Sequence, residues 1–270
     1  MKQPIFHRQQ PAPSASAGQQ VRQLRQQARF SQLELALLAG VSQRHLSCVE
    51  TGRAKPSPST LHALLSALAA PLEQCNQLFV AAGYAPRYAT SPLDAPGLKM
   101  VHEAIEHILH ANNPAPAIVI ASNWDVTATN ASAGLLFAMA GIAPEATARL
   151  NLLDTLLRPG GLGDRLANAD EIRAVAWQRA SREAVASPEL AQLLRELPAP
   201  AAQLHAPAAL PVLLTRVNTA EGELRFLSTF TTFGMPLDIT VESLRIEHLI
   251  PADAQTRQRM RAAYEHWLAD

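Results

Sequence analysis

Residues 31–53 contain two short helix patterns separated by one glycine, and this spacing strongly constrains how the first third of the chain can fold. Ser31 and Glu34 form a capping box, in which each side chain satisfies a free backbone N–H at the start of a helix. Gly40 ends that helix because glycine enters the left-handed conformation at little cost. Ser42 is placed to cap the helix that follows. The pattern predicts a helix-turn-helix.

Helices are also expected on both sides of this pair. Apolar residues from Val21 onward follow helical spacing, Ser57-Pro58 starts a helix that runs to about Ala69, and another runs from Pro71 to near Gly83. In the first helix of the pair, Leu35, Leu38 and Ala39 are expected to form the apolar stripe. We therefore predict an all-α domain of five helices over residues 18–83, preceded by a disordered tail over residues 1–17 and followed by a Pro-rich linker over residues 84–97.

Charge separates the two parts of the chain. The overall formal charge is zero, but residues 1–85 carry a net charge of +5 and residues 86–270 carry −5. Gln43, Arg44 and Ser47 lie on the outer side of the second helix of the pair, and Gln and Arg are the side chains that read adenine and guanine edges. These features favour a polyanionic partner, double-stranded DNA, for the first part.

The first part resembles the XRE-type (phage-repressor-like) helix-turn-helix. The resemblance covers residues 22–69 and is carried by Leu24-Arg25, Ser31-Gln32, Glu34-Leu35-Ala36, Ala39-Gly40-Val41-Ser42, Leu46-Ser47, Glu50, Gly52-Arg53 and Pro56-Ser57. It implies a phosphate contact from Gln32, base contacts from Gln43, Arg44 and Ser47, and backbone contacts from Arg53 and Lys55. It also implies a buried ion pair between Arg25 and Glu50, and a homodimer on paired half-sites of an operator. The full predicted DNA-binding set is Gln32, Ser42, Gln43, Arg44, Ser47, Arg53 and Lys55.

Plainer interpretations stay open for this part. The same three-helix core can be structural only, and Arg44 can be a solvated surface charge. Cys48 is expected to be a small structural residue, because no His or second Cys is spaced to activate it.

The second part, residues 98–270, is predicted as a mixed domain, which makes the whole chain α+β. Glu242 and Glu247 alternate with apolar residues and are expected on an outer strand face. The predicted strands cover residues 117–121, 126–129, 211–218, 223–233 and 239–249, and the predicted helices cover residues 98–111, 131–140, pieces of 150–197, and 253–268. Two strands, several helices and then three strands is the order of a PAS-like fold.

Signs of catalysis and of membrane insertion are weak in the sequence. His102, Glu106 and His110 share a helix face at a spacing that suits a metal ion, but a solvated polar face is the preferred interpretation. No nucleophile elbow, phosphate loop or dinucleotide fingerprint occurs, so we predict a protein that is not an enzyme. No apolar run approaches the ~18 residues that span a bilayer, and no signal-peptide core is present, so a cytoplasmic protein is expected.

The most informative feature of the second part is its set of apolar residues that could enclose an interior cavity. An ordinary packed core is the competing interpretation for each of its apolar residues. Those that could line an interior are Ile118, Ile120, Trp124, Leu135, Phe137, Trp177, Leu213, Phe226 and Phe230. The predicted ligand-binding set is Trp124, Phe137, Trp177, Phe226 and Phe230.

Residues 76–253 resemble the MmyB-like ligand-binding domain that follows XRE-type heads. The stretches that carry the resemblance include Leu78-Phe79, Ala81–Pro86, Asn123–Val126, Asn130-Ala131, Arg158–Leu162, Thr232–Thr240, Leu244–Glu247 and Pro251–Asp253. It implies a PAS-like sensor with an apolar pocket for a fatty-acid-like ligand and no other cofactor. Ala169 follows Asn168 where relatives often carry Trp, which puts the pocket size in question.

The sequence therefore predicts a DNA-binding transcription regulator that senses a small apolar molecule. Two alternatives stay open: a metal-dependent enzyme with a DNA-binding head, and a regulator whose second domain is only a dimerisation platform.

Overall fold

The computed structural model describes residues 16–142, 150–185, 187–200 and 212–269, and the chain divides into two units with a boundary between Ala89 and Thr90. The predicted tail lies outside the described residues up to position 15. Ser16 caps the first helix, which starts at Ala17: the Ser16 side chain accepts a hydrogen bond from the backbone N–H of Gln19.

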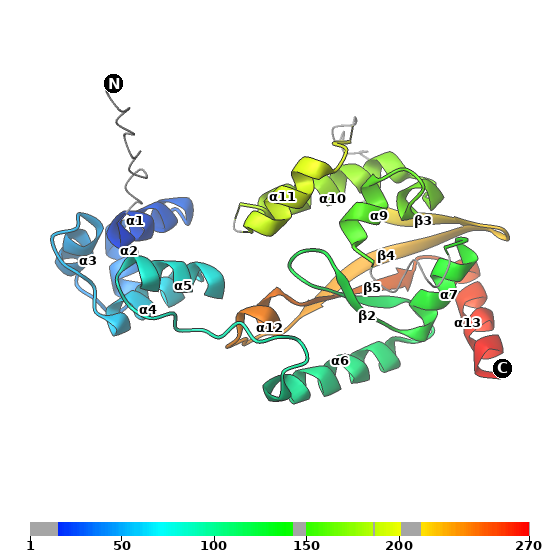
Figure 1. The fold of residues 1–270 in the computed structure, drawn as a ribbon, viewed down its shortest axis with the longest axis horizontal. Coiled ribbons are helices and arrows are strands. Elements are labelled where there is room, and N and C mark those ends of the chain that lie inside the picture. The colour runs from blue at the N-terminus through cyan, green and yellow to red at the C-terminus, as the bar shows by residue number, and fades with distance from the viewer. Residues whose placement is uncertain (1–15, 143–149, 186, 201–211, 270) are drawn as a thin grey trace, which may run out of the picture. The chain divides into compact units, whose positions relative to one another are not determined.

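The first unit is all-helical, as predicted (Figure 1). Each of Ser31, Ser42 and Ser57 accepts a hydrogen bond of 3.1 Å from the backbone N–H three residues later. Gly40 has a φ of 65°, which confirms its role in the turn. The helices of this unit are α1 (Ala17–Gln27), α2 (Gln32–Leu38), α3 (Gln43–Glu50), α4 (Pro58–Ala67) and α5 (Leu72–Ala81).

Close approach of α1 and α3 depends on a residue that the sequence pattern did not single out. A Cβ atom on Gly18 would lie 2.0 Å from the backbone oxygen of Val49, so glycine alone allows this contact. The core beneath is made of fully buried residues from all five helices, among them Val21, Leu35, Leu46, Leu61 and Leu78.

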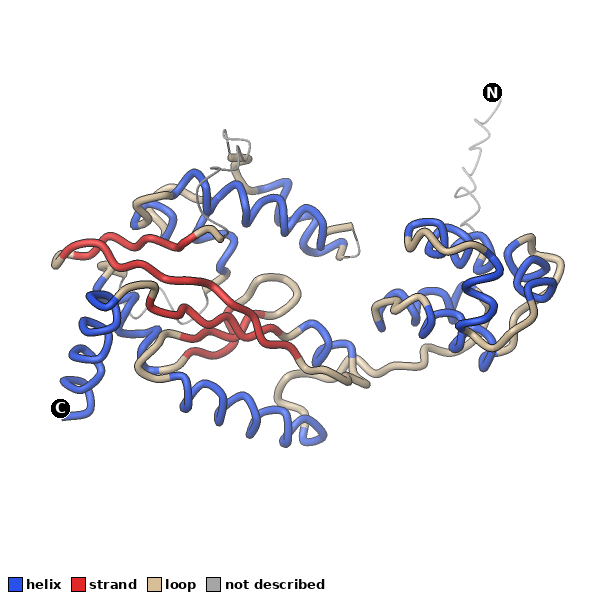
Figure 2. The backbone as a smooth tube through the Cα atoms, turned by 180° about the vertical axis from the view of Figure 1, so that it is seen from behind, coloured by secondary structure: helices blue, strands red, loops and turns tan. Residues whose placement is uncertain are grey.

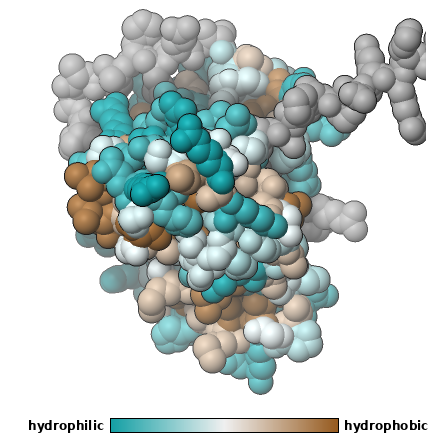
Figure 3. All heavy atoms as spheres, turned by 90° about the vertical axis from the view of Figure 1, so that its left-hand side faces the viewer, coloured by the Kyte–Doolittle hydropathy of each residue, from teal (hydrophilic) through white to brown (hydrophobic). Residues whose placement is uncertain are grey.

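The predicted apolar stripe of α2 is wrong at Leu38. Leu38 is 61% exposed, and Leu37 beside it is 72% exposed. The buried pair is Leu35 and Ala36; residue 38 lies on the flank of this two-turn helix that is remote from Ala36. Exposed apolar residues are not unusual in this protein, and Figure 3 shows brown, apolar patches among hydrophilic ones on the face that it draws.

The second unit combines helices with a five-stranded antiparallel sheet, so the predicted α+β class is confirmed (Figures 1 and 2). The strand order across the sheet is β2-β1-β5-β4-β3. The strands are β1 (Ala117–Ile120), β2 (Val126–Thr129), β3 (Leu214–Thr219), β4 (Gly222–Thr232) and β5 (Arg245–Pro251). The helices are η1 (Pro96–Leu98), α6 (Lys99–Asn112), α7 (Ala131–Met139), α9 (Leu152–Leu157), η2 (Leu162–Arg165), α10 (Ala169–Glu183), α11 (Pro188–Glu196), α12 (Ile239–Ser243) and α13 (Ala254–Ala269).

Both faces of the sheet are covered. Helix α6 packs on one face, where Ile105 and Leu109 meet Val119 and Ile246. Helices α7, α9 and α10 lie over the opposite face (Figure 1). Side chains alternate between the two faces along each strand, so a polar residue between two apolar ones need not face solvent.

Residues 239–249 were expected to form one strand, and this is wrong. The segment is a short helix, α12, followed by β5. Asp238 is the cause: its carboxylate accepts hydrogen bonds from the backbone N–H groups of Thr240 and Val241 and caps the helix. The strand expected at 211–218 is β3, which starts at Leu214; residue 211 lies outside the described residues.

The segment predicted as a linker is held at several points within each unit. In the first unit, Tyr84 donates from its hydroxyl to the Pro56 carbonyl at 2.9 Å, and Asn76 donates to the Tyr88 carbonyl at 2.8 Å. In the second unit, the Ser91 N–H donates to Asp238 at 3.1 Å, and the Thr240 hydroxyl donates to the Ser91 carbonyl at 2.7 Å. We refer to this pair of bonds to α12 as the Ser91 latch.

The length and hydropathy of each helix show whether it could span a membrane. Of the helices in the described part of the chain, none is both long and apolar enough to cross a bilayer.

Candidate DNA-binding helix and ligand pocket

Helix α3 presents an outer polar side and an inner apolar side. Leu46 and Val49 are buried, and Gln43 and Arg44 are exposed. Ser47, one turn after Gln43 and Arg44, is half-buried. The helix begins at Ser42, whose hydroxyl accepts from a backbone N–H and is engaged as a cap. The exposed side chains stand at the N-terminal end of the helix, which is the end that recognition helices direct at base edges.

A buried ion pair fixes the inner side of α3. Arg25 donates from Nε and Nη2 to the two oxygens of Glu50 at 2.6 and 3.0 Å. Burial alone would raise the pKa of Glu50, but the hydrogen bonds from Arg25 and Gln32 outweigh it and hold the pKa below its ordinary value. The ion pair that the resemblance implied is therefore present, and it ties α1 to the recognition helix.

Gln32 has a role that the sequence did not indicate. Its amide Nε2 donates to Glu50 at 2.8 Å, so this nitrogen is used within the protein in the DNA-free structure. A phosphate contact by Gln32 stays a prediction.

The two basic residues after α3 differ in their surroundings. Arg53 is exposed, and within the described residues it forms no ion pair. Lys55 is exposed too, but its Nζ lies 4.4 Å from the centre of the Tyr84 ring, an arrangement that orients the ammonium group by a cation–π contact. Both leave their positive charges available to an anion.

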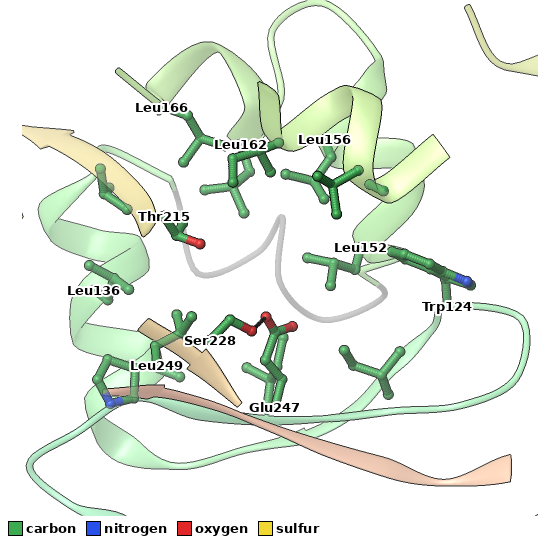
Figure 4. Close-up of a pocket in the computed structure, with 18 of the residues that line it drawn as sticks. Trp124, Leu136, Leu152, Leu156, Leu162, Leu166, Thr215, Ser228, Glu247 and Leu249 are labelled. Atoms are coloured by element: carbon green, nitrogen blue, oxygen red, sulfur yellow. Dashed lines mark hydrogen bonds between the residues drawn. The ribbon is translucent and has the colours of Figure 1, made fainter. Parts of the chain in front are cut away.

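An apolar cavity of about 240 Å³ lies between the sheet and helices α7, α9 and α10 of the second unit. Leucines from several segments distant in sequence form most of its wall (Figure 4). The residues around it are Pro116, Ile118, Ile120, Trp124, Ala133, Leu136, Phe137, Leu152, Leu156, Leu162, Leu166, Ile172, Val175, Ala176, Arg179, Leu213, Thr215, Val217, Ser228, Phe230, Arg245, Glu247 and Leu249.

Three of the five predicted ligand-binding residues line this cavity. They are Trp124, Phe137 and Phe230. Phe226 is fully buried in the surrounding core, and Trp177 is half-buried against it, but neither lines the cavity. The stripe of α10 that faces the cavity is Ile172, Val175, Ala176 and Arg179, and Trp177 lies outside that stripe.

Trp124 is held in an uncommon conformation in the turn between β1 and β2. Its φ is 70°, a left-handed value that is rare for a bulky residue. Hydrogen bonds around it fix the turn: Asn151 donates to the Asn123 carbonyl at 2.8 Å and to Asp125 at 2.9 Å. The indole Nε1 donates to Glu183 of α10 at 2.8 Å, so the turn is fastened to that helix.

Charged groups gather at this end of the cavity. Glu183 accepts from Arg179 at 2.9 Å and from Nη1 of Arg245 at 3.0 and 3.1 Å. Arg245 is buried, and its guanidinium lies 4.8 Å from the centre of the Trp124 ring. Burial lowers the pKa of Arg245, against the attraction of Glu183, although an arginine stays protonated at neutral pH.

The predicted outer position of Glu247 is wrong, and Glu242 lies in α12 rather than on a strand. Glu247 points into the cavity and is hydrogen-bonded to the hydroxyl of Ser228 on β4 (Figure 4). The apolar residues Leu244 and Ile246 alternate with it because they pack under α6 on the other face. Burial raises the pKa of the Glu247 carboxyl above its ordinary value, more than the Ser228 hydrogen bond lowers it.

The alternative metal site lies on α6. His102 is half-buried, and Glu106 and His110 are exposed. Within the described parts of the chain, no group of three or more His, Cys, Asp or Glu side chains is arranged to hold a metal ion.

Ala169, the departure from the related pattern, packs against the edge of the core at the start of α10. Its neighbour Asn168 donates to the Leu214 carbonyl at 2.8 Å and accepts from the Arg216 N–H at 3.2 Å. Asn168 therefore fastens α10 to β3 and helps to define the cavity wall.

Comparison with known proteins agrees with these two sites. Residues 101–263 match the family "MmyB-like transcription regulator ligand binding domain", and residues 16–78 match a helix-turn-helix domain. A search among curated proteins gives no match. A solved structure described as "Structure of an RNA-binding Light-Oxygen-Voltage Receptor" aligns at 13% identity with a TM-score of 0.26, over 94% of this chain and 64% of that chain. At that TM-score the alignment does not establish a shared fold, and this chain spans less than two thirds of that receptor's length.

The family match covers more than half of the chain, includes every strand of the sheet and surrounds the cavity. The helix-turn-helix match contains α1 to α4 and most of α5. The chain therefore belongs to the MmyB-like transcription regulators, DNA-binding proteins that carry a ligand-binding domain behind a helix-turn-helix.

Proposed function

We propose that this protein is a one-component regulator in which an apolar, fatty-acid-like molecule in the C-terminal cavity controls DNA binding by the N-terminal helix. The observation that carries the proposal is the apolar cavity of about 240 Å³ in the same chain as an exposed recognition helix. The strand order β2-β1-β5-β4-β3, with α7, α9 and α10 over the face that borders the cavity, supports a PAS-like fold for the sensor.

DNA reading is assigned to α3. Gln43 and Arg44 reach base edges in the major groove, and Ser47 contacts the same groove one turn later. Arg53 and Lys55 approach the phosphates, which position the helix without reading sequence. Two copies bind as a homodimer, since two half-sites about 34 Å apart require two recognition helices.

Arg44→Ala is expected to remove most of the operator preference and leave the fold intact. Arg44 is exposed and has no ion-pair partner in the described residues, so its loss leaves nothing buried and unsatisfied. One bidentate Arg–guanine contact is worth about 1–3 kcal/mol of discrimination, roughly 5- to 150-fold for each half-site. The measurement is the affinity for an operator selected from random DNA relative to a scrambled sequence, at one fixed salt concentration.

Arg22→Ala is the matched control, since Arg22 is an exposed arginine of the same unit that lies on α1. It is expected to weaken binding to both sequences equally. An unchanged preference in Arg44→Ala would show that Arg44 is a solvated surface charge.

Ligand binding is tested by extracting the purified protein with organic solvent and identifying the released molecules by mass spectrometry. A stoichiometric amphiphile supports the sensor, because a largely apolar cavity is a favourable site for hydrocarbon. An empty protein that also fails to take up any added amphiphile would favour the second domain as a dimerisation platform only.

Enzymatic activity is the remaining alternative, and metal analysis addresses it. We propose that the protein is not an enzyme and that α6 carries a solvated polar face. Stoichiometric zinc that is lost on His110→Ala would instead favour a metal-dependent enzyme.

A further inference from the structure

Helix α13 is longer than the surface on which it packs. Its first half is held by the second unit: Thr256 and Met260 are buried, and the Thr256 hydroxyl accepts a hydrogen bond from the backbone N–H of Arg225 at 3.0 Å. Every residue from Glu265 to Ala269 is exposed. In Figure 1 this second half of the helix extends away from the sheet. A part of α13 therefore has no covering element among the described residues of its unit.

The uncovered half carries large apolar side chains. Trp267 is 49% exposed and Leu268 is 62% exposed. The Tyr264 ring stacks on the Trp267 ring, with 5.7 Å between the ring centres and 21° between the ring planes. Tyrosine and tryptophan are frequent anchors of protein interfaces, because they bury much apolar area with few rotatable bonds. All three residues follow residue 263, so this apolar patch lies outside the part of α13 that matches the family.

Charges of both signs lie on the same side of α13 as this patch. Arg257, Arg261 and Glu265 follow one another at four-residue spacing, and Tyr264 and Leu268 share their side of the helix. We call these five residues the α13 face. The three charged side chains are exposed, and none of them forms an ion pair within the described parts of the chain. Even Arg261 and Glu265, one turn apart, do not pair with each other.

The α13 face is complementary to itself. In a two-fold symmetric dimer each contact occurs twice, because the same patch of both copies takes part. When two such helices run antiparallel and cross midway between Arg261 and Glu265, each arginine faces the glutamate of the other copy. Leu268 then lies beside the aliphatic stems of Arg257 and Arg261 of the other copy. Both the opposite charges and the apolar area are satisfied in this arrangement.

We propose that the α13 face is a self-association surface, on which the α13 helices of two copies pair antiparallel. This inference rests on the homodimer of the proposed function and adds the surface that holds it. The face from Arg257 to Leu268 is about 17 Å long at 1.5 Å per residue. An interface of this length belongs to the weak class, below about 1,200 Å². The pair therefore dissociates at micromolar concentration in free protein, and two heads on one operator raise its effective concentration.

Sedimentation of the full-length protein without DNA tests the surface, over a concentration series at low salt, where exposed charges are least screened. The natural protein is expected to show a reversible monomer–dimer equilibrium. Arg261→Glu and Glu265→Arg each place like charges opposite one another at two symmetric points, so each is expected to raise the dissociation constant at least tenfold. The double substitution restores opposite charges at both points and is expected to return the constant to near its natural value.

Gln255→Glu is the matched control, because Gln255 is exposed on α13 but lies on the opposite side of the helix from the α13 face. It is expected to leave the dissociation constant unchanged. Circular dichroism of each variant checks that the fold is kept. The recovery in the double substitution separates a contact between copies from a structural effect, since a helix damaged by either single change would not be repaired by adding the other.

Each outcome has a defined meaning. A dimer that persists in both single variants would overturn the α13 surface and leave the homodimer standing on another surface. A natural protein that stays monomeric at every concentration, with and without operator DNA, would overturn both. Loss of the dimer in the single variants without recovery in the double substitution would overturn the antiparallel pairing. Ligand sensing by the cavity is unaffected by any of these results.

Discussion

Glu50→Ala is expected to lower the free energy of unfolding of the helix-turn-helix unit by about 3–5 kcal/mol, because it leaves a buried charge without its partner. Glu50 is 2% exposed and accepts three hydrogen bonds, two from Arg25 and one from Gln32. After the substitution, Arg25 keeps only its bond to the Phe30 carbonyl. For a unit of this size, the midpoint of thermal unfolding should fall by more than about 10 °C. Scanning calorimetry of the full chain measures it.

Two variants test this explanation. The double substitution Arg25→Met with Glu50→Leu is expected to recover most of the loss, since apolar replacement of a whole buried pair is often neutral or stabilising. Glu34→Ala, which removes only the exposed half of a helix cap, is expected to cost about 1 kcal/mol. A loss from Glu50→Ala no larger than that of Glu34→Ala would mean that the buried pair contributes little.

Acid should act on the same pair. The pKa of Glu50 is below its ordinary value in the folded protein, so the pair stabilises the unit above that ordinary value. This contribution is lost as the pH falls through the folded-state pKa. The difference between the natural protein and Glu50→Ala should therefore shrink at strongly acidic pH.

Gly163→Ala is expected to disrupt the cavity wall and to destabilise the second unit by about 1–3 kcal/mol or more. A Cβ atom on Gly163 would lie 2.0 Å from the backbone oxygen of Leu156. Backbone cannot move aside as a side chain does, so η2 must separate from α9. Both segments carry leucines that line the cavity, so uptake of the ligand should fall together with the unfolding temperature.

Gly134→Ala is the control for this prediction. Gly134 lies on the exposed side of α7, and an added Cβ would meet no atom within 4 Å. Alanine in this helix should raise stability by about 0.5–1 kcal/mol. Equal effects of the two substitutions on the unfolding of the second unit would contradict the close packing of η2 against α9.

The first unit could be predicted closely because its signals are local. Ser31, Ser42 and Ser57 each bond to a backbone group three residues away, and Gly40 acts through its own φ. Each of these interactions joins residues that are close together in the sequence. The role of Gly18 was missed because it depends on a contact with the backbone of Val49, which lies on another helix.

The sequence predicted that an apolar cavity exists, but it identified only some of the residues that line it. Its wall comes from strands and helices that meet only after folding, so periodicity within one segment does not reveal it. Phe226 and Trp177 are apolar and belong to or pack against the surrounding core, but neither lines the cavity. The predicted position of Glu247 was wrong because the alternation of polar and apolar residues only separates the two faces of a strand. It does not tell whether helices cover both faces of the sheet.

The Ser91 latch joins the cavity to the start of the second unit. Asp238 and Thr240 hold Ser91, and β5, which carries Arg245 and Glu247 into the cavity, begins directly after α12. The chain that comes from the helix-turn-helix unit is therefore hydrogen-bonded, at Ser91, to the segment that leads into β5. Two hydrogen bonds and one short helix thus connect the strand that borders the cavity with the point at which the chain enters the second unit.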